Sequence, residues 1–151
     1  MPHFERVYTV TDYYDGPRSG IADFGGHPHV YRSLYLDRDT WDLDEDRFEL
    51  SPISTADLEL ALEDWAIFCR WRDAFDAGRT ALETHPALPE DRARWEEIAR
   101  LLAHRLGIDP DHRVLVRGAF RVREPVPPLC VGVLRPFEVQ WSSVELTAPA
   151  G

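Results

Sequence analysis

Lysine is absent from the 151 residues, and all seventeen basic residues are arginine. This excludes enzymes that form a Schiff base through a lysine amine. Cysteine is also scarce: Cys69 and Cys130 are the only two, and both lie in apolar stretches, so we expect reduced thiols rather than a disulfide framework. A set of cations made only of arginine is typical of a G+C-rich genome, and we interpret the protein as bacterial.

Long apolar segments are lacking as well. The longest charge-free apolar run covers residues 126–134, and a membrane-spanning helix needs about 20 such residues. The first fifteen residues contain neither a basic start nor the apolar segment of a secretory signal. We therefore expect a soluble, cytoplasmic protein that has no membrane partner.

Positive charge is in short supply, because 17 arginines face 27 acidic residues and the net charge is −10. Such a balance argues against general nucleic-acid binding, which needs a cationic surface. Eleven acids lie between Asp37 and Asp64, whereas residues 113–123 contain four arginines and no acid. The acidic stretch is either a solvated face or a docking face for a cationic protein. The residues that would form this docking face are Asp37, Asp39, Asp42, Asp44 and Asp46.

Motifs for cofactors and covalent catalysis are absent. The sequence has no G-x-S-x-G element, phosphate loop or dinucleotide fingerprint, so we expect no cofactor. Asp42, Asp44 and Asp46 resemble the start of a calcium loop, but Arg47 and Ile53 occupy positions that need Gly and Glu. The absence of Gly and Glu at these two positions excludes an EF-hand.

The stretch from Ser54 to Gly78 predicts one long helix that carries eight large apolar residues around most of its circumference. Ser54 or Thr55 is the expected N-cap and Gly78 the expected end. Because so apolar a helix needs covering on most sides, we expect strands and a second helix to enclose it. The second helix is predicted for residues 89–106, where Trp95, Ile98 and Leu102 share a face.

Short strands are predicted before and after the helices. Together they indicate one α+β domain over residues 1–151, with a small antiparallel sheet or partly closed β-barrel and a two-helix hairpin (about 54–78 and 89–106) inserted between strands. Gly25-Gly26 predicts a two-residue hairpin turn. The predicted strands cover residues 4–14, 21–24, 30–36, 47–50, 112–123, 129–134 and 137–146.

Reactive side chains are densest between Asp12 and His29. Asp12 or Asp15 is a candidate base, and Arg18 beside Tyr14 is a candidate clamp for an anion. Arg117 and Arg121, on the predicted 112–123 strand, are further anion-binding candidates. The structural alternative is that Asp15-Gly16-Pro17 and Gly25-Gly26 only make turns and that the tyrosines only pack.

Two further features are candidates for function. His27 and His29 have the H-x-H spacing that directs two imidazoles to one side of a strand, so they are candidate metal ligands, although a site needs a third or fourth ligand. Asp64 falls on the apolar side of the long helix, where burial raises the pKa of a carboxyl group, and it is a candidate catalytic acid. Alternatively, Asp64 pairs with Arg72 or with an arginine of residues 113–123.

The sequence leaves two hypotheses for function. The first is an interaction module, such as an inhibitor, immunity or accessory protein, whose acidic face binds a cationic partner. The second is a small enzyme or small-ligand binder with a pocket at the Asp12–His29 loops. A mixed aromatic and charged pocket of several hundred cubic ångströms favours the second hypothesis, and a flat acidic face favours the first.

Overall fold

The computed structural model describes residues 3–36, 46–126 and 134–144. The chain divides into two compact units. The barrel unit contains the residues up to Pro52 and those from Ile108 onward, and the helical unit is Ile53–Gly107. The single domain expected over residues 1–151 stays a prediction.

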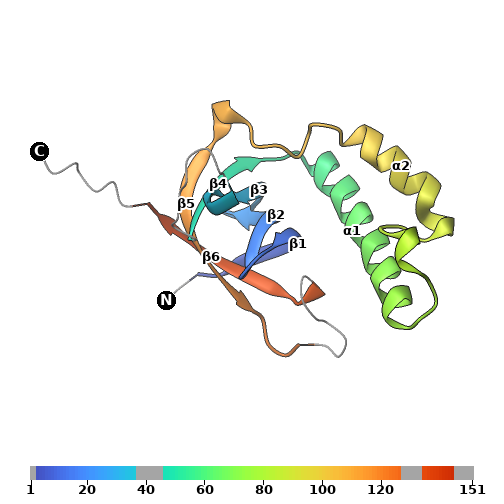
Figure 1. Cartoon of the computed structure of the whole chain (residues 1–151). Helices are drawn as coiled ribbons and strands as arrows, with labels where there is room; N and C mark the ends of the chain where they lie inside the picture. The colour runs from blue at the N-terminus through green and yellow to red at the C-terminus, as the bar shows by residue number, and fades with distance from the viewer. Residues whose placement is uncertain (1–2, 37–45, 127–133, 145–151) are drawn as a thin grey trace, which may run out of the picture. The chain divides into compact units, whose positions relative to one another are not determined.

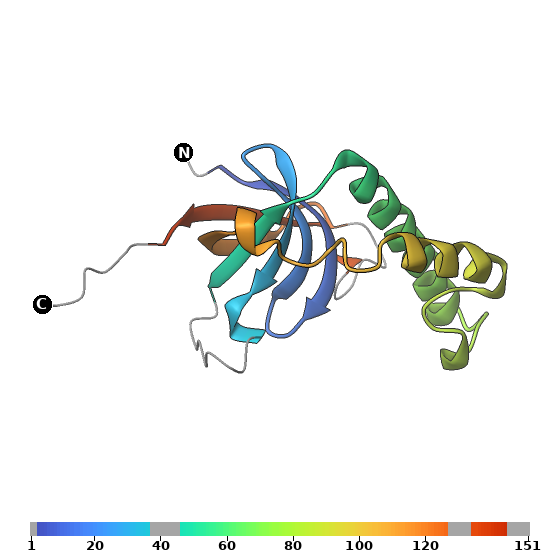
Figure 2. The same cartoon turned by 90° about the horizontal axis from the view of Figure 1, so that it is seen from above.

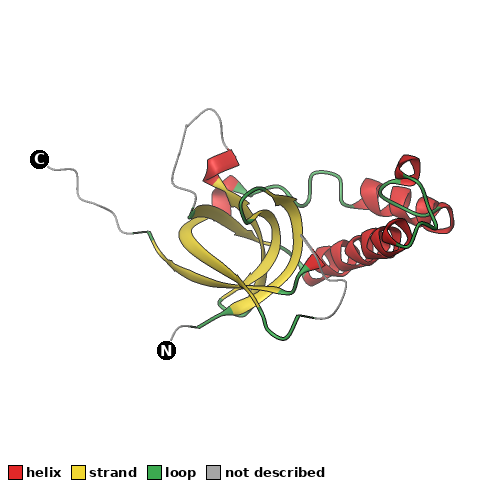
Figure 3. Ribbon diagram, turned by 60° about the horizontal axis from the view of Figure 1, so that its bottom comes forward, coloured by secondary structure: helices red, strands yellow, loops and turns green. Residues whose placement is uncertain are grey.

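Six antiparallel strands form a closed barrel in the order β1-β2-β3-β4-β5-β6, which confirms the predicted fold class (Figures 2 and 3). The barrel closes where β1 pairs with β6, through Glu5 opposite Val139 and Arg6 opposite Glu138. A short 3₁₀ helix, Leu34–Leu36, follows β3. The strands are β1 (Glu5–Tyr13), β2 (Pro17–Phe24), β3 (His27–Ser33), β4 (Arg47–Pro52), β5 (Val114–Val122) and β6 (Phe137–Ser143).

The hairpin between β2 and β3 turns at Gly25-Gly26, as the sequence predicts. Phe24 pairs with His27, and the two glycines between them have φ angles of 61° and 78°. Two consecutive residues with positive φ are typical of a type I′ turn, which glycine adopts without strain.

The predicted edges of two strands are wrong. β2 begins at Pro17 rather than residue 21, and β3 ends at Ser33 rather than residue 36. The turn at Asp15-Gly16-Pro17 leads directly into β2, and Gly20 lies within that strand. Its φ is +154°, and the missing side chain lets β2 approach the carbonyl group of Thr9 on β1. Most of the predicted 129–134 strand lies outside the described residues.

Inward-facing side chains of the strands fill the barrel. Phe48, Leu50 and Val139 are almost completely buried, and Tyr31 donates a hydrogen bond from its hydroxyl group to the Thr9 carbonyl oxygen at 3.0 Å. Trp141 lies against Tyr31 and Phe48. This alternation of inward and outward residues is what a small closed barrel requires.

The helical unit consists mainly of α1 (Thr55–Asp76) and α2 (Arg92–Leu101), which confirms the predicted helix pair (Figure 1). Ser54 caps α1 by accepting a hydrogen bond from the Asp57 amide at 3.1 Å. α2 ends earlier than residue 106, because the chain leaves the helix at Leu102 and His104 has a φ of 67°.

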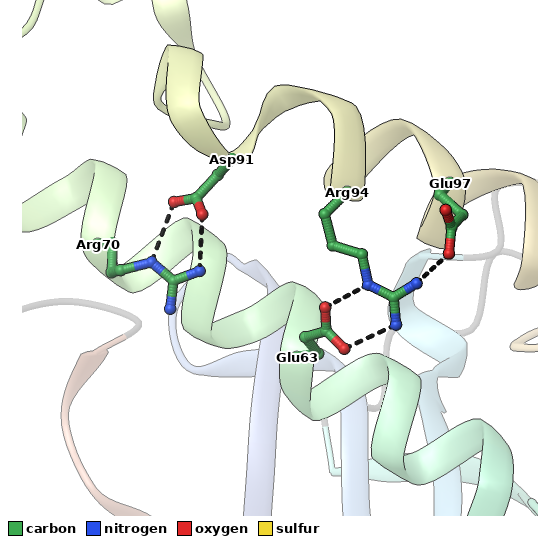
Figure 4. A network of polar contacts seen from close by, with 5 residues as sticks. All are labelled: Glu63, Arg70, Asp91, Arg94 and Glu97. Atoms are coloured by element: carbon green, nitrogen blue, oxygen red, sulfur yellow. Dashed lines mark hydrogen bonds and ion pairs between the residues drawn. The ribbon is translucent and has the colours of Figure 1, made fainter.

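Ion pairs connect the two helices across their exposed side (Figure 4). Arg70 donates two hydrogen bonds to the Asp91 carboxylate, at 3.0 and 2.9 Å. Arg94 binds Glu63 in the same two-pronged way and also contacts Glu97. The Arg94 hydrogen bonds lower the pKa of Glu63. Beneath these pairs, the buried residues Ile67, Ala87 and Ile98 form the core of the unit.

The buried residues of the barrel core belong to strands, and Ile67 of α1 belongs to a separate core with Ala87 and Ile98. A small closed barrel has an interior just wide enough for its own side chains. The expectation that strands enclose the long helix stays a prediction. Of the aromatic residues on α1, only Trp71 is buried, and its indole N–H donates to the Thr84 hydroxyl group at 2.9 Å. Within the described ranges, no helix is both long and apolar enough to cross a membrane.

Candidate ligand-binding site

A cavity of about 490 Å³ opens at the end of the barrel where β2, β4 and β6 begin. This volume lies within the range of small-molecule sites. Four segments contribute side chains: the β1–β2 turn, the start of β4, the second half of β5 and the start of β6. The lining residues are Tyr13, Asp15, Gly16, Pro17, Arg18, Asp46, Phe48, Gly118, Ala119, Phe120, Arg121, Val122, Arg135 and Phe137.

Aromatic rings make up the apolar part of the lining. Phe48 and Phe120 are in contact, with ring centroids 5.4 Å apart, and Phe48 is only 2% exposed. Phe137 lies beside Tyr13, with centroids 6.2 Å apart. These rings provide apolar surface against which a flat molecule can pack.

Arg18 contributes a buried positive charge to the lining. Arg18 is 2% exposed, and its side chain points inward on the same face of β2 as Gly20 and Ala22. Its guanidinium group donates from Nε to the Tyr14 carbonyl oxygen at 2.5 Å and from Nη2 to that of Asp15 at 3.2 Å. The centre of the Tyr35 ring lies 5.0 Å from the guanidinium carbon of Arg18. The β1–β2 turn therefore fixes the position of this cation.

Arg135 contributes a second cation from the residues that lead into β6. Its Nη2 atom donates to the Tyr13 hydroxyl group at 2.8 Å, and its guanidinium carbon lies 5.3 Å from the centre of the Phe137 ring. The bond to Tyr13 links β1 and β6 beyond the two residue pairs that join these strands. A guanidinium group held between aromatic rings retains a planar fork that matches a carboxylate.

The acidic and basic residues of the cavity lining differ in their exposure to solvent. Asp15 and Asp46, the two acidic lining residues, are both exposed, whereas Arg18 is buried and Arg135 is half-buried. Water screens the exposed carboxylates more strongly than it screens the buried cations. The lining therefore combines exposed carboxylates with less exposed guanidinium groups.

Four residues that the sequence singles out belong to the described lining of this cavity, namely Asp15, Arg18, Asp46 and Arg121. The guanidinium group of Arg121, however, lies on the outer face, where it donates to Glu138 at 2.6 Å and covers the ring of Phe4. β5 explains this, because Phe120 points inward and its neighbour Arg121 must point outward.

Other predicted residues of the same region lie outside the lining. Asp12 accepts a hydrogen bond from the Ser19 hydroxyl group at 3.2 Å, and Tyr14 stacks on Tyr35 with centroids 6.1 Å apart. Arg117 lies on β5 directly opposite Arg47 of β4. None of these three predicted site residues belongs to the described lining.

The two histidines lie at the opposite end of β2 from the cavity. His27 is exposed beside the hairpin turn, and His29 is buried against the edge of the Phe24 ring. The Nδ1 atom of His29 lies 2.8 Å from the His27 carbonyl oxygen. Among the residues that the structure describes, no group of three or more His, Cys, Asp or Glu side chains is arranged to hold a metal. The metal site at this pair stays a prediction.

Asp64 belongs to the helical unit and not to the lining of the cavity. Burial raises the pKa of its carboxyl group, as the helical pattern predicts. The expected partner Arg72 donates instead to Asp76 at 3.2 Å, one helical turn further on. Within the described part of the chain, no cation pairs with Asp64. A catalytic role for Asp64 stays a prediction.

Four residues of the predicted acidic face, Asp37, Asp39, Asp42 and Asp44, lie outside the described residues. Asp46, the fifth, is exposed at the start of β4 and its carbonyl oxygen accepts a hydrogen bond from the Gly118 amide at 2.9 Å. Asp46 therefore lies at the rim of the cavity.

Sequence reasoning missed Tyr13, Arg135 and Phe137 as site residues. One signal was present, since Arg135 is the only charged residue between Glu124 and Glu138. A single cation at the end of an apolar stretch indicates a specific environment, but the sequence does not show that Arg135 lies beside Tyr13.

Comparison with known proteins adds no relative. No family model, no curated protein and no solved structure matches the chain.

Proposed function

We propose that this protein binds a small organic molecule in the cavity at the end of its barrel. The observation that carries the proposal is the cavity itself, about 490 Å³ in volume and lined by aromatic rings with a few fixed charged groups. Ligand sites in proteins have this size and this mixture of apolar walls and few polar anchors. They also occur often at the mouths of β-barrels.

Binding is better supported than catalysis. The described lining contains no Ser, Thr, Cys or His, so it lacks the usual nucleophiles and the commonest general base. Of the predicted catalytic residues, Asp15 lies in the described lining. It is exposed, and the turn between β1 and β2 explains its positive φ of 55°. The proposed function is therefore that of a ligand-binding or ligand-sensing protein.

A screen of small fragments by protein-observed NMR tests this proposal. Fragments that bind should shift the amide signals of Gly118, Val122 and Phe137. Val122→Trp places a large side chain in the cavity and should abolish those shifts. Leu82→Trp is a matched control on the helical unit, because Leu82 is 66% exposed and outside the cavity. If no fragment shifts the cavity signals, the proposal is wrong.

The interaction module remains the alternative, and its support is the concentration of acids between residues 37 and 64. Charge reversal separates the two functions. Changing Asp42 and Asp44 together to Arg, and keeping Asp46 because it lines the cavity, should abolish capture of a cationic protein and should leave fragment binding in the cavity intact.

A further inference from the structure

We propose that the ligand of the barrel cavity is an aryl carbonyl compound: a flat aromatic molecule whose carbonyl oxygen accepts a hydrogen bond from the Tyr13 hydroxyl group. This inference rests on the proposed function and narrows it to one chemical class. It follows from the hydrogen bond that Tyr13 makes with Arg135, from the exposure of Tyr13 to solvent, and from the aromatic walls beside it.

The hydrogen bond between Arg135 and Tyr13 uses the tyrosine hydroxyl group as an acceptor. The Nη2 atom of Arg135 donates to the Tyr13 hydroxyl oxygen at 2.8 Å. A phenolic hydroxyl group also has one O–H donor, so its own proton needs a separate acceptor. Among the contacts of the described residues, none supplies that acceptor. A hydroxyl group that accepts from a cation is also polarised, which makes it a stronger donor.

The position of Tyr13 brings this donor to the cavity. Tyr13 is the last residue of β1, lines the cavity and is 41% exposed. A ligand that covers the tyrosine ring displaces solvent from the hydroxyl group and must supply an acceptor of its own, because an unpaired donor costs free energy. This requirement favours a ligand with an accepting oxygen atom over one of the same shape without it.

The aromatic part of the ligand is inferred from the walls. Phe48, Phe120 and Phe137 line the cavity from β4, β5 and β6. Phe48 and Phe137 are buried, so the packing around them fixes their rings. Phe120 is half-buried, and its ring centroid lies 5.4 Å from that of Phe48. Aromatic molecules pack well against such rings in offset or edge-to-face arrangements.

A carbonyl group attached to an aromatic ring meets both requirements. Its oxygen atom lies in the plane of the ring, and hydrogen bonds to a carbonyl oxygen are directed near that plane. Such a molecule can pack its faces against the phenylalanines and present its edge to Tyr13, whose ring centroid lies 6.2 Å from that of Phe137.

Three probes separate the two requirements. Acetophenone has both the aromatic ring and the carbonyl group, α-methylstyrene has nearly the same shape but no acceptor, and cyclohexyl methyl ketone has the carbonyl group on a ring that is not flat. We expect acetophenone to bind most tightly in NMR titrations that follow the amide signals of Gly118, Val122 and Phe137. Its affinity should exceed that of α-methylstyrene about threefold to tenfold, the usual contribution of one hydrogen bond.

Tyr13→Phe removes the hydroxyl group and keeps the ring. It should lower the affinity for acetophenone to that for α-methylstyrene. Any shift of Arg135 in this variant affects both probes, so the ratio of the two affinities isolates the hydrogen bond. If Tyr13→Phe does not fold, as judged from its NMR spectrum, nuclear Overhauser effects between acetophenone and the Tyr13 ring of the unchanged protein carry the test, and their absence would overturn the inference.

Tyr14→Phe is the matched control. It removes the hydroxyl group from the neighbouring tyrosine, which stacks on Tyr35 and is not part of the described lining. The ratio of the affinities for acetophenone and α-methylstyrene should equal that of the unchanged protein.

Failure of this inference and failure of the proposed function give different results. Equal or tighter binding of α-methylstyrene would overturn the carbonyl assignment, and equal or tighter binding of cyclohexyl methyl ketone would overturn the aromatic assignment. A preference for acetophenone that persists in Tyr13→Phe would overturn the assignment to Tyr13. Absence of binding by all three probes would overturn the inference, and only a fragment screen that also fails at the cavity would overturn the proposed function.

Discussion

Gly118 on β5 and Trp141 on β6 lie directly opposite each other, and the indole ring of Trp141 occupies the place of a side chain at Gly118. A Cβ atom built on Gly118 would lie 2.5 Å from Cζ3 of Trp141 and 3.2 Å from the ring of Phe48. The ring also donates from Nε1 to the Asp23 carbonyl oxygen at 2.8 Å, so its position is fixed. The glycine therefore sets the packing of the barrel core beside the cavity.

Gly118→Ala should destabilise the protein by about 1–3 kcal/mol, the usual cost of an additional carbon atom in a filled core. Urea unfolding monitored by tryptophan fluorescence measures this change. Gly107→Ala is the control, because no atom lies within 4 Å of its Cβ position. An unchanged free energy of unfolding for Gly118→Ala would contradict the packing described here.

Glu49→Gln should destabilise the barrel by about 1–3 kcal/mol, the cost of weakening a buried charged hydrogen-bonding group. The Glu49 side chain is 10% exposed and accepts from Arg32 at 3.3 Å and from Arg113 at 3.2 Å. Asp76→Asn removes the exposed pair with Arg72 and should change stability by less than about 1 kcal/mol. Equal effects of the two substitutions in urea unfolding would show that burial of Glu49 contributes nothing.

Asp64→Asn should stabilise the protein at neutral pH. Burial raises the pKa of Asp64 in the folded protein, so its ionisation opposes folding. This cost is absent below the unfolded pKa of about 3.9 and is complete once the pH exceeds the folded pKa. Thermal unfolding should therefore give a higher Tm for the variant at about pH 7 and an equal Tm at about pH 3. Asp73→Asn, at an exposed position of the same helix, should not show this pH-dependent difference.

His112 should titrate above its ordinary pKa, because its Nδ1 atom lies 2.7 Å from the Asp109 carboxylate. The pair should stabilise the protein below the unfolded histidine pKa of about 6.5, and this stabilisation should disappear as the pH rises through the folded pKa. The pKa of Asp109 is lowered by the same hydrogen bond, so stabilisation is also lost as the pH falls through that value.

NMR titration of the His112 ring signals checks this prediction. Asp109→Asn should lower the pKa of His112, and Asp111→Asn should lower it less, because Asp111 contributes only a smaller charge interaction. A larger effect of Asp111→Asn would contradict the assigned hydrogen bond.

Local signals in the sequence were sufficient to predict most of the helices and strands. Ser54 predicted the start of α1, Gly25-Gly26 predicted the β2–β3 hairpin, and the alternation of Val114, Val116 and Phe120 predicted β5. Each depends on neighbours within a few residues, so backbone preference and periodicity determine the outcome. The predicted start of β2 at residue 21 was wrong, because the sequence does not show that Gly20 lies within the strand and lets β2 approach β1 closely.

The candidate site was only partly predictable for the same reason. Asp15 and Arg18 lie in one turn, and their proximity follows from the chain itself. Arg135 reaches Tyr13 across 122 residues of sequence, and closure of the barrel alone brings the two together. Likewise, the apolar circumference of α1 did not show which element would cover it.

The amino-acid order by itself determined the helix pair, the strand-rich flanks, the acidic balance and the turns, because these depend on short-range geometry and on composition. Tertiary structure alone decided that six strands close on their own side chains and that two cations from distant segments share one cavity. Such long-range contacts depend on how whole strands pack against one another. The local preferences of single residues do not determine that packing.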